Sequence, residues 1–216
     1  MAETRRPYRR EPEDVRREAL ISAALDLIAV GGPAAATVRA IADRAGVTPG
    51  LIRHYFASKD ELVLESYRQT MERLTADNAA VLAREPADPL GNLAGFVVAA
   101  LTPPVADPAR AGLWAGFLYG VQNDPRFKEI HIQNYLAYRD LLKSLIEQLP
   151  RAASAEQCRD DAIACNGVID GLWLEASSVP EIFVPGQIAK IGLTAVGAIL
   201  GVDLLEAWKG SAAEAP

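Results

Sequence analysis

The stretch of this chain that most constrains its fold runs from Thr37 to Glu61 and reads TVRAIADRAGVTPGLIRHYFASKDE. Thr37 fits the N-cap of a first short helix, because its hydroxyl oxygen can accept a hydrogen bond from a free backbone N–H. The apolar residues of that helix share one face: Val38, Ile41, Ala42 and Ala45. Gly46 then fits the C-cap, since glycine adopts left-handed backbone at little cost.

A second short helix follows the turn. Thr48 fits its N-cap and Pro49 its first helical position, where a missing N–H has no consequence. One side of this helix is apolar and consists of Leu51, Ile52, Tyr55 and Phe56. The other side consists of Gly50, Arg53, His54 and Ala57. Ser58 and Glu61 form the capping box of a third helix.

The second helix is too short to be stable alone, so its apolar side must pack on neighbouring helices. The Gly50–Arg53–His54 side is then presented outward. This arrangement fits a helix-turn-helix, in which the second helix enters the major groove of DNA. By spacing alone it fits an ordinary αα-corner of a helical domain equally well.

The residues themselves favour the first interpretation. Gly50 to Leu62, GLIRHYFASKDEL, resembles the DNA-binding domain of the TetR family of bacterial transcriptional regulators, and the match runs from about Arg16 to Leu64. Its most specific part is His54–Tyr55–Phe56 followed by Ser58–Lys59. The resemblance implies an all-α protein with an N-terminal three-helix helix-turn-helix domain and a C-terminal helical domain for ligand binding and dimerisation.

Arg53 is the best candidate for reading a base, because a guanidinium can donate two hydrogen bonds to guanine. The family often has an aromatic residue there, and it often has a lysine where this chain has Ala57. The resemblance implies phosphate contacts from several further residues, and Gly50 would let the backbone approach DNA. The predicted DNA-binding set is Thr37, Thr48, Pro49, Gly50, Arg53, His54, Tyr55 and Lys59.

The charge distribution fits this orientation. The chain has a net charge of −6, but residues 1–57 carry nine Arg and seven Asp or Glu, a net of +2, and the remainder carries −8. The acidic part would repel DNA and favour one orientation on it. Four arginines near the start could form an arm that contacts DNA or simply a solvated tail: Arg5, Arg6, Arg9 and Arg10.

The sequence gives little support for other classes of protein. No apolar run near 18 residues predicts a membrane span, and the charged N-terminus lacks the apolar region of a secretory signal. Two cysteines, Cys158 and Cys165, cannot build a disulfide framework, which fits the cytoplasm. Two histidines, no metal-ligand spacing, no P-loop and no dinucleotide motif argue against an enzyme, a metal site or a cofactor.

Prolines divide the rest of the chain into segments of helical length without strand-type alternation. About nine helices are predicted, in a DNA-binding domain of residues 1–57 and a second domain of residues 58–216. Besides the two short helices, the segments are about Pro12–Val30, Ser58–Arg84, Leu90–Leu101, Ala109–Asn123, Arg126–Leu149, Ala155–Ser178 and Gln187–Trp208.

The last two segments are rich in small and apolar residues and must be largely buried. Two such helices from each subunit could form a four-helix dimer interface, as the final helices do in the family resembled, or they could form a monomeric core. A single short recognition helix reads too few bases to be selective, so the homodimer is favoured. The main apolar stripe is Ile188, Ile191, Gly192, Ala195, Val196, Ile199 and Leu200.

A ligand site is expected in the second domain, where aromatic residues alternate with Gly112, Gly116 and Gly120. The predicted ligand-binding residues are Trp114, Phe117, Tyr119, Tyr135, Tyr138, Asn166, Asp170 and Trp173, with Asn123, Gln133, Asn134 and Glu175 as further polar candidates. This region resembles the BetI-type branch of the family, typified by a choline-responsive regulator. That resemblance implies a cationic or amphipathic ligand, although another small metabolite fits the composition equally well.

These features predict a ligand-responsive transcriptional repressor. As a homodimer it would bind a palindromic double-stranded DNA operator, and a small-molecule inducer would release it. The alternative is a helical small-molecule-binding or scaffolding protein that does not act on DNA.

Overall fold

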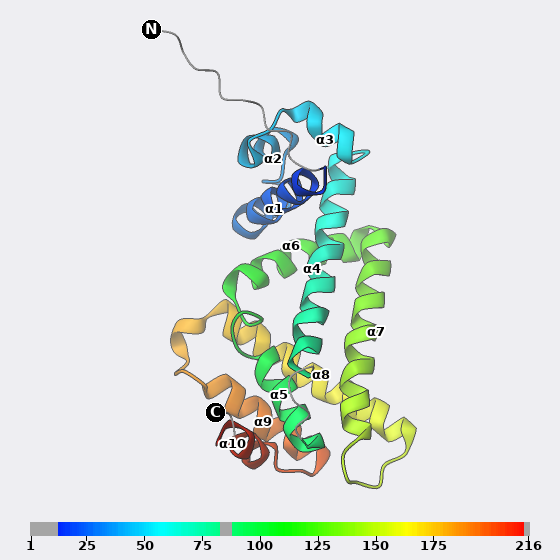
Figure 1. Ribbon diagram of the computed structural model, residues 1–216, viewed down its shortest axis with the longest axis vertical. Coiled ribbons are helices and arrows are strands. Elements are labelled where there is room, and N and C mark those ends of the chain that lie inside the picture. Colours follow the sequence, from blue (N-terminus) through cyan, green and yellow to red (C-terminus); the bar gives the residue numbers. More distant parts are fainter. Residues whose placement is uncertain (1–12, 83–87, 214–216) are drawn as a thin grey trace. The chain divides into compact units, whose positions relative to one another are not determined.

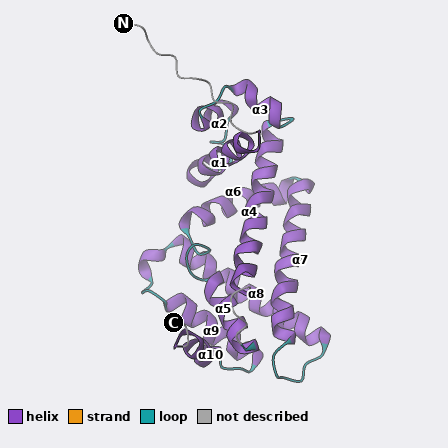
Figure 2. Cartoon of the chain, in the orientation of Figure 1, coloured by secondary structure: helices purple, strands orange, loops and turns teal. Residues whose placement is uncertain are grey.

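The computed structural model describes residues 13–82 and 88–213, and within them every regular element is a helix (Figures 1 and 2). The prediction of an all-α fold is confirmed, with ten α-helices and one short 3₁₀ turn in these ranges. The Arg-rich segment with Arg5, Arg6, Arg9 and Arg10 and the predicted helix start at Pro12 lie outside the described residues. Within the same ranges, no helix combines the length and apolar character needed to cross a bilayer.

The chain forms two compact units, one ending at Ser66 and the other beginning at Tyr67. The division falls within helix α4 (Lys59–Leu82), later than the boundary after residue 57 expected from the sequence. The reason is that the first turns of α4 belong to the first unit. Arg17 pairs there with Glu65 at 2.9 Å, and Leu62 is fully buried.

The first unit contains α1 (Glu13–Gly31), α2 (Val38–Ala45), α3 (Pro49–Tyr55) and the start of α4. Thr37 Oγ1 accepts a hydrogen bond from the backbone N–H of Ala40 at 3.1 Å, and Ser58 Oγ accepts one from that of Glu61 at 3.1 Å. Gly46 has φ +68°, the left-handed backbone expected of a C-cap. The core of the first unit consists of buried apolar residues from its helices and from the end of α3: Leu20, Ile21, Ala24, Ile28, Ile41, Ala42, Ile52, Phe56 and Leu62.

The second unit continues α4 and adds the remaining helices. Their bounds are α5 (Pro89–Ala100), α6 (Pro108–Asn123), α7 (Pro125–Glu147), α8 (Ala155–Ser178), the turn η1 (Pro180–Ile182), α9 (Gln187–Leu200) and α10 (Leu204–Ala213). Three of them begin at a proline preceded by an aspartate, and the carboxylates of Asp88, Asp107 and Asp124 each accept a backbone N–H of the first turn. The Asp–Pro pairs in the sequence therefore set where these helices start.

The single helix predicted over Gln187–Trp208 is wrong, because the chain breaks it into α9 and α10. Gly201 takes φ +68° and ends α9, and Leu204 starts α10. Gly197 allows the chain to fold back closely, since a Cβ at this position would lie 2.6 Å from the carbonyl oxygen of Val202.

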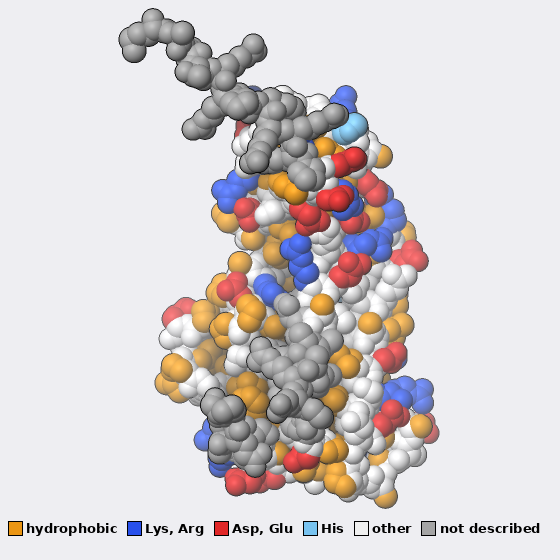
Figure 3. All heavy atoms as spheres, viewed as in Figure 1, with side chains coloured by type: hydrophobic (Ala, Val, Ile, Leu, Met, Phe, Trp, Pro, Cys, Tyr) orange, Lys and Arg blue, Asp and Glu red, His pale blue; other side chains and the backbone are white. Residues whose placement is uncertain are grey.

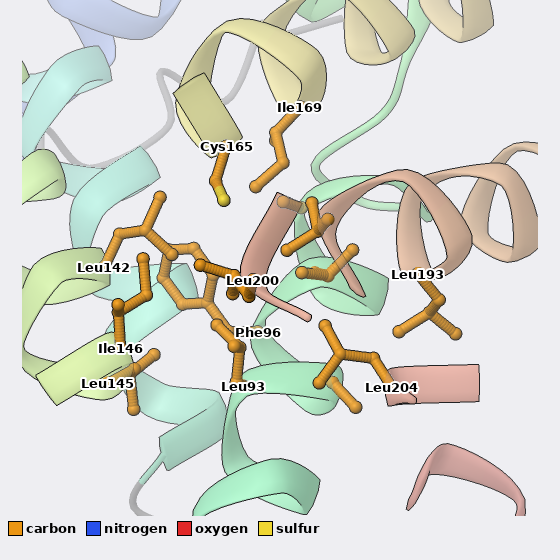
Figure 4. Packing of buried hydrophobic residues seen from close by; sticks show 14 of the residues in the cluster. Leu93, Phe96, Leu142, Leu145, Ile146, Cys165, Ile169, Leu193, Leu200 and Leu204 are labelled. Carbon is orange, nitrogen blue, oxygen red and sulfur yellow. The ribbon is translucent and has the colours of Figure 1, made fainter. Parts of the chain in front are cut away.

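The core of the second unit lies between α5, α7, α8, α9 and α10 (Figure 4). Phe96 of α5, Leu142 and Ile146 of α7, and Leu193 of α9 are almost completely buried in it. Cys165 of α8 is buried in the same cluster, and burial raises the pKa of its thiol to about 12. At neutral pH this side chain is therefore a small apolar group rather than a reactive thiolate.

Candidate nucleic-acid interface and ligand pocket

Two buried side chains hold the short helix α3 in the first unit. Ile52 is 1% exposed and Phe56, which follows the helix, is 4% exposed. The guanidinium of Arg17 from α1 lies 5.2 Å from the centre of the Phe56 ring. This cation–π contact adds to the packing of the buried side of α3. Tertiary packing, not intrinsic propensity, therefore stabilises this two-turn helix.

The opposite side of α3 is open. Thr48, Pro49, Gly50, Arg53 and His54 are all exposed, while Tyr55 and Lys59 are half-buried. His54 contacts the edge of the Tyr55 ring, with 5.0 Å between ring centres. A Cβ at Gly50 would meet no atom of the described chain within 4 Å. The described protein therefore has room for a side chain at this position.

Hydroxyl groups at both helix starts lie on the surface. Thr48 occupies the N-cap of α3 by its backbone, but its hydroxyl makes no capping hydrogen bond to this helix. The Thr37 hydroxyl does cap α2, yet its own proton remains available for donation, since the cap uses the oxygen as an acceptor. Both hydroxyls can therefore donate to an anion such as phosphate.

Arg53 differs from the neighbouring arginines of α2 in its partners. Arg44 donates to Asp26 at 2.7 Å, and Arg39 pairs with Asp43 at 3.9 Å. Arg53 forms no ion pair with any residue that the structure describes. Basic and acidic side chains are mixed over the visible face of the molecule (Figure 3). What distinguishes Arg53 from Arg39 and Arg44 is the lack of an ion pair within the described residues.

A pocket of about 440 Å³ lies within the second unit and is lined by residues of α4, α5, α6, α7 and α8. This is the size range of cavities that bind small organic molecules. The structure brings together six of the eight side chains predicted from the sequence: Trp114, Tyr135, Tyr138, Asn166, Asp170 and Trp173. They come from three helices that are separate in the sequence. The Trp114 and Trp173 rings meet edge to face, with 6.1 Å between their centres.

The structure does not place the other two predicted residues in this pocket. Phe117 is buried away from it against Tyr67, with 4.8 Å between ring centres. Tyr119 is 73% exposed, because five residues of helix turn it about 140° from Trp114. Of the additional polar candidates, Asn134 lines the pocket, whereas Asn123, Gln133 and Glu175 are exposed and do not.

Several lining residues were not predicted from the sequence. His131 lines the pocket beside Asn134, Tyr135 and Tyr138, and together they follow the i, i+3, i+4, i+7 spacing of one helix face. That spacing could have added His131 to the set. Met71 and Thr75 of α4 also line the pocket, and only their four-residue separation gave any signal.

Asp170 is the acidic side chain of the pocket wall. It is open to the cavity, yet the surrounding protein removes part of its hydration, and this desolvation raises the pKa of its carboxyl. Its Oδ2 accepts a hydrogen bond from Asn166 Nδ2 at 2.8 Å, which opposes the shift only in part. Burial together with the charge of Asp170 raises the pKa of the nearby Tyr138 hydroxyl, so that group stays protonated.

His131 connects the pocket to α4. Its Nδ1 lies 2.8 Å from the hydroxyl oxygen of Tyr67, a hydrogen-bond distance. Burial lowers the pKa of His131 and raises the pKa of Tyr67 to about 12, so both groups are neutral at pH 7. The residues that the structure describes contain no cluster of His, Cys, Asp or Glu arranged to hold a metal ion.

The apolar stripe of the last segments divides between two environments. Ile188, Val196 and Leu200 of α9 pack into the core of their own unit. Ile191 of the same helix is 42% exposed, and on α8 Ile163 and Leu174 are 44% and 41% exposed. Part of the predicted interface face is therefore open in the single chain.

Comparison with known proteins places these features in one family. A family model described as bacterial regulatory proteins of the tetR family matches residues 20–66, and one described as the C-terminal part of BetI-type transcriptional repressors matches residues 89–201. The HTH-type transcriptional regulator BetI 2 of Chromohalobacter salexigens is 31% identical over 170 residues, 78% of this chain and 81% of that protein. BetI of Stenotrophomonas maltophilia is 32% identical over 167 residues, 77% and 84% of the two chains.

Solved structures of other transcriptional regulators have a similar fold. The crystal structure of a transcriptional regulator from Pseudomonas aeruginosa PAO1 is 28% identical, with a TM-score of 0.80 over 91% of this chain and 96% of that one. A regulator from Saccharomonospora viridis, solved in complex with choline, is 19% identical with a TM-score of 0.72 over 83% and 94% of the chains. At that identity it shows a shared fold.

The helix-turn-helix unit followed by a helical unit with a pocket defines a DNA-binding transcriptional regulator. More narrowly, the chain belongs to the TetR family of bacterial regulatory proteins and has a C-terminal region of the BetI repressor type. The prediction of a transcriptional regulator rather than an enzyme is confirmed.

The raised pKa of Asp170 predicts a pH-dependent stability effect. Its protonated form favours folding fully below the ordinary pKa of 3.8, and this contribution is lost as the pH rises through the folded-state pKa. Asp170→Asn should therefore unfold at a higher temperature than the wild type at pH 7 without ligand, and at the same temperature below pH 3.8. Thermal unfolding across this pH range checks it.

Asp160→Asn, on the exposed side of the same helix, is the matched control and should change stability little at either pH. An Asp170→Asn chain less stable than the wild type at pH 7 would contradict the desolvation argument.

Proposed function

We propose that two copies of this chain form a homodimer that represses transcription by binding a palindromic DNA operator. A cationic or amphipathic small molecule bound in the pocket of the second unit then releases the DNA. The observation that carries this proposal is the anchored helix α3, which has an open outer side and an Arg53 guanidinium without an ion-pair partner among the described residues.

The contact with DNA follows from the residues on the outer side of α3. Arg53 would donate two hydrogen bonds to a guanine in the major groove, and the exposed Gly50 would let the backbone come close to the bases. Thr37, Thr48, His54, Tyr55 and Lys59 would contact phosphates, which position the helix without reading sequence. Pro49 starts the helix and sets the direction of its first turn.

Dimerisation follows from the open apolar side chains of α8 and α9. Ile163 and Ile191, which do not line the pocket, are each more than two-fifths exposed. Gly167 lies exposed on α8, and a Cβ added there would meet no atom of the described chain within 4 Å. Small residues between apolar ones allow two helices to approach closely. Pairing α8 and α9 across a twofold axis would build a four-helix interface and set two recognition helices roughly 34–36 Å apart.

The pocket favours a cation over an anion. Asp170 is acidic, His131 is neutral at pH 7, and among the described residues no Lys or Arg lines the cavity. The aromatic faces of Trp114, Trp173 and Tyr135 add cation–π attraction for a ligand in this space. Choline, which the S. viridis regulator binds, is one small cation of suitable charge.

Release would act through α4, which is continuous from Lys59 in the first unit to Leu82 in the second. Met71 and Thr75 of this helix line the pocket, and Tyr67 is hydrogen-bonded to the pocket residue His131. A ligand that binds better when these contacts shift would move the population away from the DNA-binding arrangement. Such a regulator would act in the cytoplasm, where its operator lies.

A helical ligand-binding or scaffolding protein without DNA remains the competing function, and Arg53 separates the two. Arg53→Ala should weaken binding to the DNA flanking its own gene by about 1–3 kcal/mol per half-site, because it removes a bidentate base contact. Fluorescence anisotropy with labelled DNA measures this affinity.

Arg44→Ala is the matched control, since this arginine of the same unit is paired with Asp26 and should leave operator affinity unchanged. Absence of specific DNA binding by the wild type, or equal affinity of the Arg53→Ala protein, would contradict the proposed role of Arg53.

A variant at Tyr67 tests whether the hydrogen bond to His131 takes part in ligand-induced release of DNA. Tyr67→Phe keeps the ring that packs on Phe117 and Phe127 but removes the hydrogen bond to His131. Operator affinity without ligand should be retained, while the loss of affinity on adding choline or 2-phenylethylamine should shrink by about 0.5–2 kcal/mol. Anisotropy titrations with and without ligand measure the difference.

Tyr119→Phe, which removes an exposed hydroxyl outside the pocket, serves as the control. A ligand response in Tyr67→Phe equal to that of the wild type would exclude this hydrogen bond from the release mechanism.

A further inference from the structure

We propose that the ligand of this pocket is a protonated primary or secondary amine with an apolar body, and that its N–H groups are held by Asn166 and Asp170. The proposal deepens, and rests on, the proposed ligand-binding function. It separates this chain from regulators that prefer a quaternary ammonium, which has no N–H to donate.

The first observation is an acceptor without a partner. Asn166 is 4% exposed and lines the pocket, and its Nδ2 donates to Asp170 Oδ2 at 2.8 Å. Its Oδ1 is buried and has no hydrogen-bond partner among the described residues. That oxygen has almost no accessible surface, so a ligand N–H would reach it only after the Asn166 side chain turns toward the cavity, and the hydrogen bond then formed would satisfy a buried acceptor.

The orientation of the Asn166 amide follows from its neighbour. Turning the amide over would place Oδ1 against the carboxylate of Asp170, and two acceptors would then face each other. The hydrogen bond to Asp170 therefore holds Nδ2 toward the carboxyl group and directs Oδ1 elsewhere. The unpaired acceptor is a consequence of the side-chain chemistry on α8 and not of an arbitrary assignment.

The second observation is a carboxylate without a cation. Asp170 follows Asn166 by four residues, so both side chains lie on one face of α8. Within the described part of the chain, no Lys or Arg pairs with Asp170, and the Asn166 amide occupies one of its several acceptor positions. An ammonium with two or three N–H groups could donate to Asn166 Oδ1 and to Asp170 together.

A quaternary ammonium fits these two acceptors poorly. Its methyl groups would still be attracted by the Asp170 charge and by the Trp114 and Trp173 rings. They could not donate to Asn166 Oδ1, so this buried acceptor would stay without a hydrogen bond. The difference between an N–H and an N–CH₃ at this position therefore decides the preference.

The rest of the pocket sets the shape of the ligand. A cavity of about 440 Å³ is far larger than an ammonium group, and Ile169, Leu174 and Trp173 give it apolar walls. An apolar body attached to the amine would fill this space and remove apolar surface from water. The ligand class is thus an amphipathic amine and not a small hydrophilic one.

A methylation series tests the proposal on the full-length wild-type protein. The probes are 2-phenylethylamine and its N-methyl, N,N-dimethyl and N,N,N-trimethyl derivatives, all cationic at pH 7, so the attraction to Asp170 stays nearly constant while the number of N–H groups falls. By isothermal titration calorimetry, the primary and secondary amines should bind at least about tenfold more tightly than the trimethyl compound, since a hydrogen bond to a charged donor contributes about 1.5–3 kcal/mol. Equal or tighter binding of the trimethyl compound, or millimolar concentrations of all four without binding, would overturn the proposal.

Two variants assign the effect to its residues. Asn166→Leu, of similar volume, should remove most of the preference for N–H while keeping binding of the trimethyl compound. Asp170→Asn should weaken all four probes, because it removes the charge that they share. Tyr119→Phe, outside the pocket, should reproduce the wild-type series. An unchanged preference in Asn166→Leu overturns the assignment, and the wild-type series decides the ligand class even where a variant does not fold.

Measuring operator binding on the same protein distinguishes failure of the ligand proposal from failure of the proposed repressor function. If the wild-type protein binds operator DNA but prefers the quaternary probe, only the ligand class proposed here is contradicted. A protein that binds the amines but no operator contradicts the repressor function and leaves the amine site in place.

Discussion

The burial of Ile52 and Phe56 is the constraint on which the proposed DNA-binding surface depends. A helix of two turns does not persist alone in water, so the two side chains must remain packed for α3 to exist. The Arg17 guanidinium over the Phe56 ring ties α1 to the same anchor. Because the apolar side is committed to the core, Gly50, Arg53 and His54 are directed to solvent. Burial on one side of α3 thus creates the surface on the other.

Helix α4 connects this anchor with the ligand pocket. Its first turns pack in the first unit through Leu62 and the Arg17–Glu65 ion pair, and its later turns contribute Met71 and Thr75 to the pocket wall. Tyr67 lies where the two units divide and bonds to His131. Under the proposed function, a ligand that shifts these pocket residues would act on the first unit through this helix. Linkage would then make the influence of ligand and DNA on each other reciprocal.

Local signals in the sequence predicted most of the fold. Thr37, Gly46 and the Asp–Pro pairs act within a few residues, so their caps and helix starts could be located from the chain alone. The sequence pattern predicts one helix where α9 and α10 lie, although Gly201 marks the break between them. The pocket was harder to predict, because its walls come from five helices whose rotation depends on packing. Trp114 and Phe117 lie in one segment, yet one faces the cavity and the other packs on Tyr67.

The most direct measurement of the DNA-reading role of α3 is methylation protection of guanine N7 on the DNA upstream of its own gene, using the wild-type protein. Two α3 helices in successive major grooves should protect guanines in two symmetry-related half-sites about 10–10.5 base pairs apart or a multiple of that spacing, because Arg53 would cover N7 and O6. Protection confined to minor-groove adenines, or a single unsymmetrical site, would contradict the assignment of α3 as the recognition helix of a homodimer.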